Sequence, residues 1–425
     1  MDELKLSLFS RKREVFALIL FLAILFSFNI FLKYKQFQDF KSSKYFKTSA
    51  IVLSQYIKTT KKGKKYTVLK LKTDNSLKFY GISWQKNLKN MQSNTIKLKI
   101  NTKKISFYRY LKGFFAPVYG MKITNHNVGL KQKISTIIQN EHKSRSIKEL
   151  FSALFLGASL QKNLRKKIQI LGISHLVAIS GFHLGVLSAI IFFILTPVYR
   201  FFQNKFFPYR NLRLDLMIVT LFILFGYLYL VGFMPSLIRA YTMLVIVYIL
   251  YIRHIEIISF QTLALTTVLL LSFFPNLLFS ISFWFSISGV FYIFLFLKYF
   301  SSLKPWQIII LLNFWVYLMM QPIVHAIFGL FSLYQIYSPI LSMLFILFYP
   351  LELFLHIINH GDLLDGMILK LFSIKATIIQ IKTPLWFLIL FIFFSLFSAY
   401  KKIFLYILIL LDLLFFGYLI LAKIS

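Results

Sequence analysis

Long apolar runs that are almost free of charged residues are the feature that most constrains this chain. The run from Val15 to Leu32 is long enough to cross a bilayer as a helix. The runs are continuous rather than alternating, which excludes an outer-membrane barrel, and a mean hydropathy of +0.72 agrees with burial in lipid. The sequence predicts a polytopic α-helical membrane protein with about nine spans. After Leu150 the runs lie at about 175–198, 215–231, 236–252, 257–274, 277–297, 306–324, 336–357, 385–399 and 403–421.

The start of the chain indicates a retained anchor. Arg11, Lys12 and Arg13 precede the first run, and no small-residue cleavage site follows it. Positive residues flank the cytoplasmic end of a span, so we expect a cytoplasmic N-terminus. Segments longer than about 60 residues cross the membrane largely regardless of charge, so the stretch 33–150 is free to lie outside.

The charge of the chain is concentrated in this stretch. The whole sequence carries a net charge of +36, and residues 33–150 contain 27 Lys and Arg against four Asp and Glu, a net charge of +23. A near-absence of acids predicts a surface that binds a polyanion. A general Lys bias and contact with anionic lipid are the two alternatives.

Residues 38–126 also change to short alternating segments, which predict a small all-β domain resembling an OB-fold. The run Thr95–Ile100 alternates apolar residues with polar ones at every position. The other expected strands are 46–58, 65–72, 77–83, 103–109 and 118–124.

OB-folds bind single strands with Lys on the phosphates and aromatics under the bases. The predicted DNA-binding residues are Lys61, Lys62, Lys64, Lys65, Tyr66 and Trp84. Other available aromatics are Phe79, Tyr80, Phe107 and Tyr108, and about half of these rings must form the barrel core.

The connections between later runs support an external basic domain. If 33–150 lies outside, the charged connections fall inside and the uncharged ones outside, in agreement with the positive-inside rule. Pro339 and Pro350 interrupt the pattern after residue 325 and leave the span count open there. The inside connections carry Arg200, Lys205, Arg210, Arg213, Arg253, Lys298 and Lys304, and the outside ones are 232–235 and 275–276.

The stretch LGISHLVAISGFHLGVLSA (171–189) is unusually polar for the part of the chain that carries the later apolar runs. Polar residues inside a membrane are functional candidates. On one continuous helix Ser180, His183 and Leu187 would share a face that lines a polar cavity. Gly181, Gly185 and Ser188 would form a small-residue packing face. Hydrogen bonding between helices is the alternative. The predicted channel-lining residues are Ser174, His175, Ser180, Gly181, His183, Ser236 and Arg239.

Arg239 is a separate candidate because it lies one turn inside a span that starts at Pro235. A guanidinium is costly in lipid and must face protein, water or an anion. Contact with passing phosphate is the sharper hypothesis, and snorkelling to a headgroup is the alternative.

Several chemistries are not expected. The chain has no Cys and no GxxxxGK[ST] phosphate loop, so thiolate sites and ATP hydrolysis by that loop are excluded. His356 and His360 are spaced for one helix face, but the zincin Glu is missing and Gly361 is expected to end the helix. Ser180 and Gly181 resemble the Ser-Gly pair of rhomboid proteases, but in those proteases the general base comes from a different helix, and the adjacent His183 is a poor substitute. We therefore predict no enzyme activity, no cofactor and no metal site.

LGISHLVAISGFHLGVL (171–187), preceded by LFLGASLQKNLRKKIQ (154–169), resembles the ComEC family of competence DNA-uptake channels. SFYRYLKGF (106–114), MPSLIRAYTML (234–244) and FFPNLLFSISFWFSISGV (273–290) are similar to further stretches of that family in the same order. Longer family members carry a metallo-β-lactamase-like domain, which this sequence, ending at Ser425, lacks. The resemblance therefore implies that any degradation of a strand needs another protein.

The resemblance implies the following domains and role. The expected parts are a membrane anchor (1–37), an OB-fold-like periplasmic domain (38–126), a connecting amphipathic region (127–170), a competence channel domain (171–357), and an amphipathic segment with final spans (358–425). The implied function is translocation of single-stranded DNA across the bacterial inner membrane in natural transformation. A secondary transporter for an anionic solute or lipid is the alternative.

The expected partners follow from this role. They are single-stranded DNA, a periplasmic DNA receptor, a cytoplasmic ATPase or DNA-processing protein, and membrane lipid. A second copy of the chain is left open.

Overall fold

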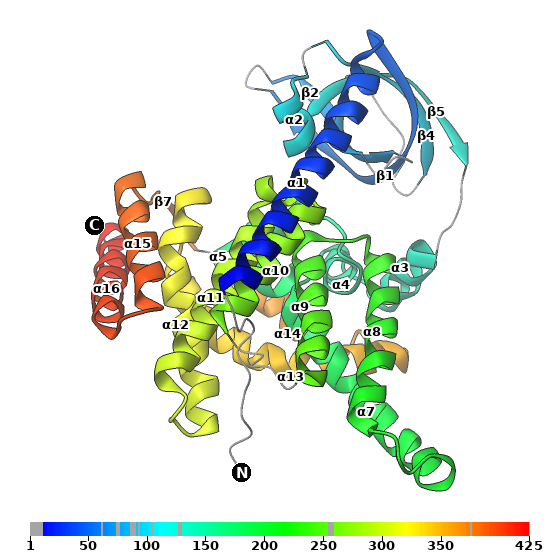
Figure 1. The fold of residues 1–425 in the computed structure, drawn as a ribbon. Coiled ribbons are helices and arrows are strands. Elements are labelled where there is room, and N and C mark those ends of the chain that lie inside the picture. The colour runs from blue at the N-terminus through cyan, green and yellow to red at the C-terminus, as the bar shows by residue number, and fades with distance from the viewer. Residues whose placement is uncertain are drawn as a thin grey trace. The chain divides into compact units, whose positions relative to one another are not determined.

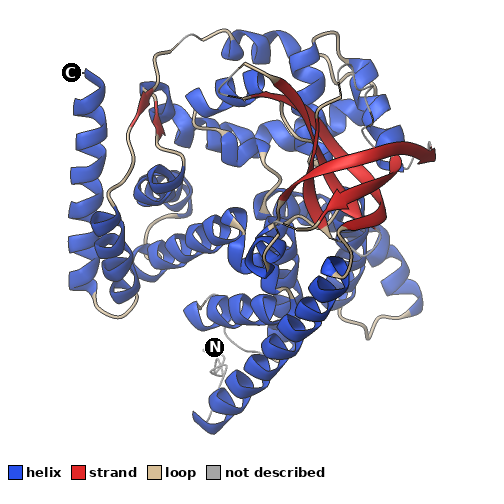
Figure 2. Ribbon diagram, turned by 90° about the horizontal axis from the view of Figure 1, so that it is seen from above, coloured by secondary structure: helices blue, strands red, loops and turns tan. Residues whose placement is uncertain are grey.

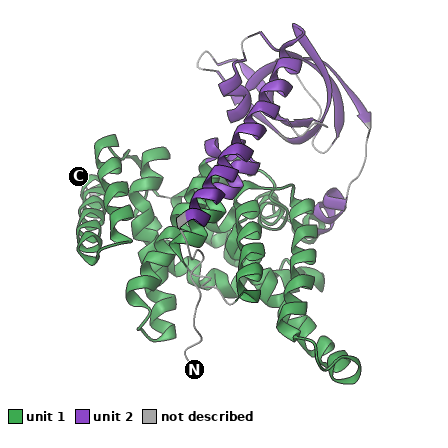
Figure 3. Cartoon of the chain, in the orientation of Figure 1, with its two compact units in different colours: residues 1–10, 138–267, 281–425 green, residues 11–137, 268–280 purple. Residues whose placement is uncertain are grey.

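The computed structural model describes residues 12–60, 63–73, 77–85, 91, 94–103, 105–125, 130–253, 259–374 and 376–424. These residues form two compact units, shown in different colours in Figure 3. One unit comprises residues 11–137 and 268–280, and the other contains 138–267 and 281–425. Each unit therefore includes segments that are far apart in the sequence.

The first unit contains a closed five-stranded barrel (Figures 1 and 2). The strands follow the order β1-β2-β3-β5-β4, and β1 also pairs with β4, which closes the ring. All pairs are antiparallel except β3 with β5. Closure removes the exposed edges that so small a sheet would otherwise present. The strands are β1 (Tyr45–Thr59), β2 (Lys65–Thr73), β3 (Lys78–Ser83), β4 (Thr95–Asn101) and β5 (Phe115–Asn125).

Alternation along β4 builds the barrel core. Ile96, Leu98 and Ile100 are buried inside, while Lys97 and Lys99 are exposed. The core continues into helix α1 (Lys12–Lys41), whose Phe37 and Phe40 belong to the same buried cluster. The end of α1, beyond the predicted span, therefore packs into the barrel core.

One predicted strand, 103–109, is wrong. Its second half begins helix α2 (Phe107–Lys112), because the Ser106 hydroxyl caps the helix by accepting a hydrogen bond from the Arg109 amide. Tyr110 of α2 points into the barrel core and packs against Phe40 of α1, with ring centroids 5.5 Å apart. The other predicted strands all coincide with observed ones.

The helices of the two units confirm the prediction of a polytopic membrane protein. Among the described residues, eight helices are long and apolar enough to cross a membrane, and α10 and α15 are shorter apolar helices. The helices after the barrel are α3 (Leu130–Glu141), α4 (Arg145–Leu156), α5 (Lys162–Ile170), α6 (Ser174–Val177), α7 (Gly181–Phe206), α8 (Leu212–Val231), α9 (Pro235–Ile252), α10 (Phe260–Phe273), α11 (Ile281–Phe300), α12 (Pro305–Ile327), α13 (Ser338–Ile357), α14 (Asp365–Phe372), α15 (Leu385–Ser398) and α16 (Lys402–Ile424).

Short irregular elements join some of these helices. The 3-10 turn η1 (Pro275–Phe279) precedes α11, and η2 (Leu333–Tyr337) precedes α13. Strands β6 (Leu330–Phe331) and β7 (Ile379–Gln380) form a two-stranded sheet. α13 begins with Pro339 in its first turn and continues through Pro350, so neither proline breaks it.

Two buried apolar clusters hold the helical unit together. One joins α7, α8 and α9 around Leu184, Leu228 and Leu237. The other joins α11, α12, α15 and α16 around Leu295 and Leu408.

Truncating one core residue of β4 tests the barrel. We expect Ile96→Ala to destabilise the barrel by roughly 2–5 kcal/mol, because its buried side chain would leave a cavity. The neighbouring Lys97→Ala, on the exposed face, leaves no cavity and should not destabilise the barrel. Proteolysis of the full-length protein in rising urea, read at sites within the barrel, measures both. Equal effects of the two variants would contradict the assigned register.

Candidate functional site: the barrel surface and an interrupted membrane segment

Aromatic rings alternate with lysines on the outer face of β1, β2, β3 and the start of β5. Lys58 faces Tyr66 in the strand register, and the Tyr66 ring lies 5.1 Å from that of Trp84. In another row of the same face, Lys70 is opposite Tyr80, which stacks on Phe115 at 4.6 Å. The arrangement offers flat rings beside cations, the combination that binds single-stranded nucleic acid.

The structure places most of the predicted DNA-binding residues on or beside this face. Lys64 and Lys65 are exposed at the start of β2, and Trp84 is 56% exposed beside the half-buried Tyr66. Lys61 and Lys62 lie outside the described residues.

The remaining candidate aromatics separate into core and surface. Phe79 is buried in the core and Phe107 packs against it, while Tyr108 lies on α2 against Phe279. Tyr56 and Phe115 complete the outer face, with the Lys58 ammonium 5.7 and 5.6 Å from their ring centroids. Sequence analysis missed both rings, because a strand pattern alone does not reveal which side of a closed barrel is outside.

Lysines also lie directly opposite one another across neighbouring strands. The register pairs Lys72 with Lys78, and two further pairs lie elsewhere on the barrel. Like charges directly opposite are destabilising, so the fold tolerates repulsion that a polyanion would relieve. Asp74 is the only acidic residue between positions 40 and 140. The further pairs are Lys47 with Lys99 and Lys97 with Lys122.

The electrostatics of Lys78 reflect this crowding. Its pKa lies below the ordinary lysine value, first because neighbouring atoms desolvate the ammonium, and then because Lys72 and Lys70 repel it. Desolvation likewise lowers the pKa of Lys70. A bound phosphate would favour the charged form of both side chains.

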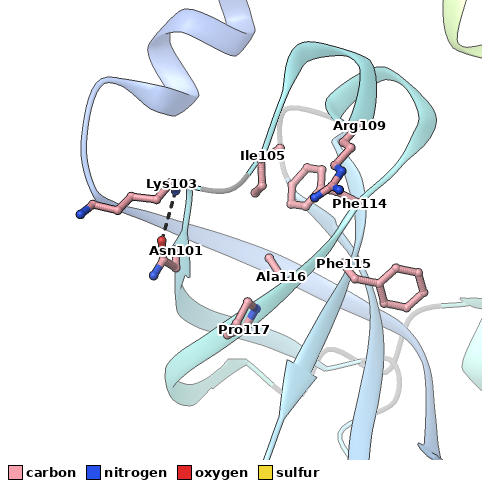
Figure 4. A pocket seen from close by; sticks show the side chains of 8 residues that line it. All are labelled: Asn101, Lys103, Ile105, Arg109, Phe114, Phe115, Ala116 and Pro117. Atoms are coloured by element: carbon pink, nitrogen blue, oxygen red, sulfur yellow. Dashed lines mark hydrogen bonds between the residues drawn. The ribbon is translucent and has the colours of Figure 1, made fainter.

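A pocket of about 370 Å³ lies where β4 ends and β5 begins (Figure 4). Lys103 and Arg109 supply its cations and Phe115 supplies an exposed ring. It therefore extends the aromatic and basic surface around the barrel. Its other lining residues are Asn101, Ile105, Phe114, Ala116 and Pro117.

In the helical unit, the segment 171–183 is interrupted rather than one continuous helix. α6 ends at Val177, and α7 begins at Gly181 after a non-helical connection at 178–180. The predicted helical face of Ser180, His183 and Leu187 is therefore wrong, because Ser180 is the N-cap of α7. Backbone outside a helix is tolerated at membrane depth only where protein or water satisfies it.

Side chains from other elements bind backbone carbonyls in this interruption and in the turn between α5 and α6. The Ser236 hydroxyl of α9 donates to the Ile179 carbonyl at 2.8 Å. Ser338 donates to the Gly172 carbonyl at 3.0 Å, and Gln335 donates to the Gln169 carbonyl at 2.9 Å. The interruption is therefore a built element of the fold. Sequence analysis did not single out Gln335 or Ser338. Their position as polar residues on either side of the start of the predicted span 336–357 could have identified them.

His183 stabilises the start of α7. Its Nδ1 accepts a hydrogen bond from the Ser180 amide at 3.1 Å, so the imidazole acts as a helix cap. The ring is fully buried against Phe345 and Tyr349 of α13. Its Nε2 has no hydrogen-bond partner among the described residues.

Arg239 is buried beside this interruption. Its Nε donates to the Ser286 hydroxyl of α11 at 2.7 Å, and only 5% of the residue is exposed. Within the described residues, no Asp or Glu oxygen lies within 4.0 Å of its guanidinium. The charge therefore faces protein without an acidic counter-ion and does not snorkel to the surface.

Gly181 makes the approach of α7 to Arg239 possible. A Cβ at this position would lie 3.0 Å from Nη2 of Arg239 and 3.2 Å from the Ala240 Cβ. The first turn of α7 is thus next to the guanidinium of Arg239, and a helix N-terminus and a guanidinium both favour an anion. A Cβ at Gly185 would meet no atom within 4 Å, so this member of the predicted small-residue face makes no close helix contact.

The structure therefore brings four of the predicted channel-lining residues together: Ser180, Gly181, Ser236 and Arg239. His183 lies on the α13 side of the same helix start. Ser174 and His175 are exposed on α6, where His175 contacts the Ser342 hydroxyl at 3.0 Å.

Comparison with known proteins matches the competence protein family over residues 154–424. This match covers the interrupted segment, Arg239 and more than half of the chain. The chain belongs to the competence protein (ComEC) family.

Recombination protein 2 of Haemophilus influenzae is 30% identical to this ComEC-family chain over 224 residues, which cover 51% of the chain. The alignment covers 26% of that protein, so the chain spans about a quarter of the length of this curated relative. No solved structure matches the chain. Family membership agrees with a role in DNA uptake during competence.

The opposed lysines of this ComEC-family barrel allow a test of charge repulsion. We expect Lys78→Gln to stabilise the barrel by roughly 0.2–1 kcal/mol at neutral pH and low salt, because it removes one like-charge pair. The gain should shrink with added salt. It should also shrink as pH rises toward 10.5, because the wild-type Lys78, whose pKa is lowered in the fold, then loses its own charge.

Lys64→Gln is the matched control, since Lys64 is exposed and precedes the paired part of β2. The urea-dependent proteolysis described above measures both variants. An equal gain from the control would attribute the effect to net charge rather than to the cross-strand pair.

Proposed function

We propose that this chain conducts single-stranded DNA across the bacterial inner membrane during natural transformation. The observation that carries the proposal is the barrel surface on which Tyr66, Trp84, Tyr80 and Phe115 alternate with lysines, in a chain of the competence family. Rings bind bases of any sequence, and lysines follow the phosphates.

The barrel supports an OB-fold assignment. It has five strands, closes through β1 and β4, and carries its rings on the β2–β3 face, the face with which OB-folds bind oligonucleotides. We place it on the periplasmic side, with the N-terminus cytoplasmic, because the charges of the connections then obey the positive-inside rule.

In the proposed path a strand passes from the barrel to the interrupted segment of the helical unit. There the start of α7 and the guanidinium of Arg239 stabilise successive phosphates without covalent chemistry. The sequence contains no phosphate loop for ATP hydrolysis, so the driving force comes from a partner ATPase or DNA-processing protein. A periplasmic receptor supplies the DNA.

Stacking by the barrel rings is tested by DNA binding to the full-length protein in detergent. We expect Tyr66→Ala and Trp84→Ala to weaken binding of a single-stranded oligonucleotide by roughly 1–3 kcal/mol each, with an unchanged salt dependence. Lys58→Gln should instead reduce the steepness of the salt dependence. Fluorescence anisotropy over a salt series measures both quantities.

Tyr108→Ala is the matched control, because Tyr108 and Trp84 are both 56% exposed but Tyr108 lies on α2. It should bind like the wild type. Undiminished binding by both Tyr66 and Trp84 variants would show that this face does not hold the strand.

The charge of Arg239 is tested by DNA uptake in a naturally transformable host that depends on this protein. Arg239→Gln should lower the entry of labelled DNA into a nuclease-protected state at least about tenfold, the effect of one lost charge-assisted hydrogen bond. Immunoblotting of membranes checks that the variant is present at normal abundance. Arg213→Gln, an exposed cation at the start of α8, is the control. Normal uptake by Arg239→Gln would remove this residue from the path.

A transporter for a small anionic solute or lipid is the second candidate, favoured by the lack of an acidic partner at Arg239 in the described part of the chain. Competition separates the two functions. An excess of inorganic phosphate, mononucleotide or anionic phospholipid at constant ionic strength should not displace a long single strand. Displacement by one of these small molecules would favour the transporter.

A further inference from the structure

Two buried imidazoles face each other away from both sites described above. His142 lies between α3 and α4, and His356 lies in the last turn of α13, with their Nε2 atoms 3.1 Å apart. His142 is 2% exposed and stacks on Phe151 with ring centroids 4.6 Å apart. The sequence separates the two residues by 214 positions, so only the fold brings them together.

The other nitrogen of each ring is already bonded. Nδ1 of His356 lies 2.7 Å from the Glu352 carbonyl, and a carbonyl only accepts, so this nitrogen carries hydrogen. Nδ1 of His142 lies 2.9 Å from Oδ1 of Asp365. If Asp365 is ionised and both rings are neutral, two Nε2 lone pairs would face each other at 3.1 Å. One additional proton turns this repulsion into a continuous chain of hydrogen bonds.

Acidic groups surround the pair, although acids are scarce in this chain. Glu352 is fully buried, its Oε2 lies 3.4 Å from Nδ1 of His356, and neither carboxylate oxygen accepts a hydrogen bond within the described residues. Glu141 accepts a hydrogen bond from the Gly361 amide at 2.9 Å. The charge of Asp362 repels that of the Asp365 carboxylate. Four of the 13 Asp and Glu residues thus gather here and favour a positive charge.

The other side chains around His142 and His356 neither cancel a positive charge on the two rings nor supply one in its place. On α4 the packed side chains are the rings of Phe151 and Phe155, and the ion pair of Arg145 with Glu149 is formed within that helix. Gly361 leaves the space open, because a Cβ there would lie 2.5 Å from Glu141 and 2.8 Å from Nε2 of His356. No group of three His, Asp or Glu in the described part of the chain could hold a metal ion. A proton between the two Nε2 atoms gives one ring a donor and leaves the other ring its acceptor.

We propose that Asp365, His142 and His356 bind one shared proton, which clamps the end of α3 to the corner between α13 and α14. Burial raises the pKa of Asp365 while His142 opposes that shift, as expected for a carboxyl that shares a proton with an imidazole. A second proton would place positive charges on two adjacent rings. The clamp is therefore closed near neutral pH and opens on acidification. This behaviour does not depend on whether the protein conducts DNA.

The absence of cysteine makes the test direct. In the full-length protein, Lys143→Cys and Leu363→Cys place spin labels on two exposed positions, one on each side of the clamp. Pulsed electron paramagnetic resonance in detergent gives their distance distribution. We expect one short distance at pH 7.5, and a longer-distance population that grows at least about tenfold at pH 5.0, across the range in which a second imidazole gains its proton.

Two further variants decide whether the pair of His142 and His356 causes the pH-dependent opening. His356→Gln places an amide donor against His142 and needs no shared proton, so its distance should stay short at both pH values. His360→Gln, an exposed histidine in the same corner, should open like the wild type. A wild-type distance that does not change with pH, or a His356→Gln variant that opens like the wild type, would overturn the proposal. Closure that requires zinc and is lost with a chelator would also overturn it.

Discussion

Satisfaction of backbone hydrogen bonds is the constraint on which this structure depends. In a hydrocarbon environment an unpaired amide or carbonyl costs several kcal/mol, so the apolar runs form helices. The basic unit meets the same requirement differently, because its ladder closes on itself through β1 and β4. Where the helical unit departs from the rule, at 169–180, side chains of α9, η2 and α13 take over the bonding. The interruption therefore depends on three distant parts of the chain.

Charge is separated along the chain in a way that supports binding of a polyanion. The barrel faces carry lysines in direct opposition, with one acidic residue between positions 40 and 140. Acids gather instead around His142 and His356, where they favour a buried positive charge. Surface ion pairs contribute little to stability, so omitting acids from the barrel costs the fold little while it keeps every ammonium available.

Local patterns predicted the parts of the fold that local physics determines. The alternation of Thr95–Ile100 gave β4, and the apolar runs gave most of the helices to within a few residues, although α1 and α7 extend well past theirs. The strand expected at 103–109 failed because the Ser106 cap favoured a helix. The continuous helix expected from residue 175 failed because Ser236 and His183 stabilise a break, and neither contact is visible as a period in the sequence.

The same limit explains which site residues were found. Arg239 and Ser236 were identified because polar groups are conspicuous in an apolar run, and the structure brings both to the interruption. His356 was first weighed with His360, but α13 ends at Ile357 and its partner is His142.

The environment of Arg239 bears on how a channel could hold a phosphate without trapping it. A carboxylate partner would cancel the charge of the guanidinium, whereas Ser286 and Met243 orient it and leave the charge uncompensated. A strong cluster of cations would bind a polyanion too tightly to release it, since each phosphate contact adds to affinity. In the proposed path, the buried Arg239 beside the first turn of α7 offers one site that successive phosphates would occupy in turn. Passage requires binding that is favourable enough to enter and weak enough to leave.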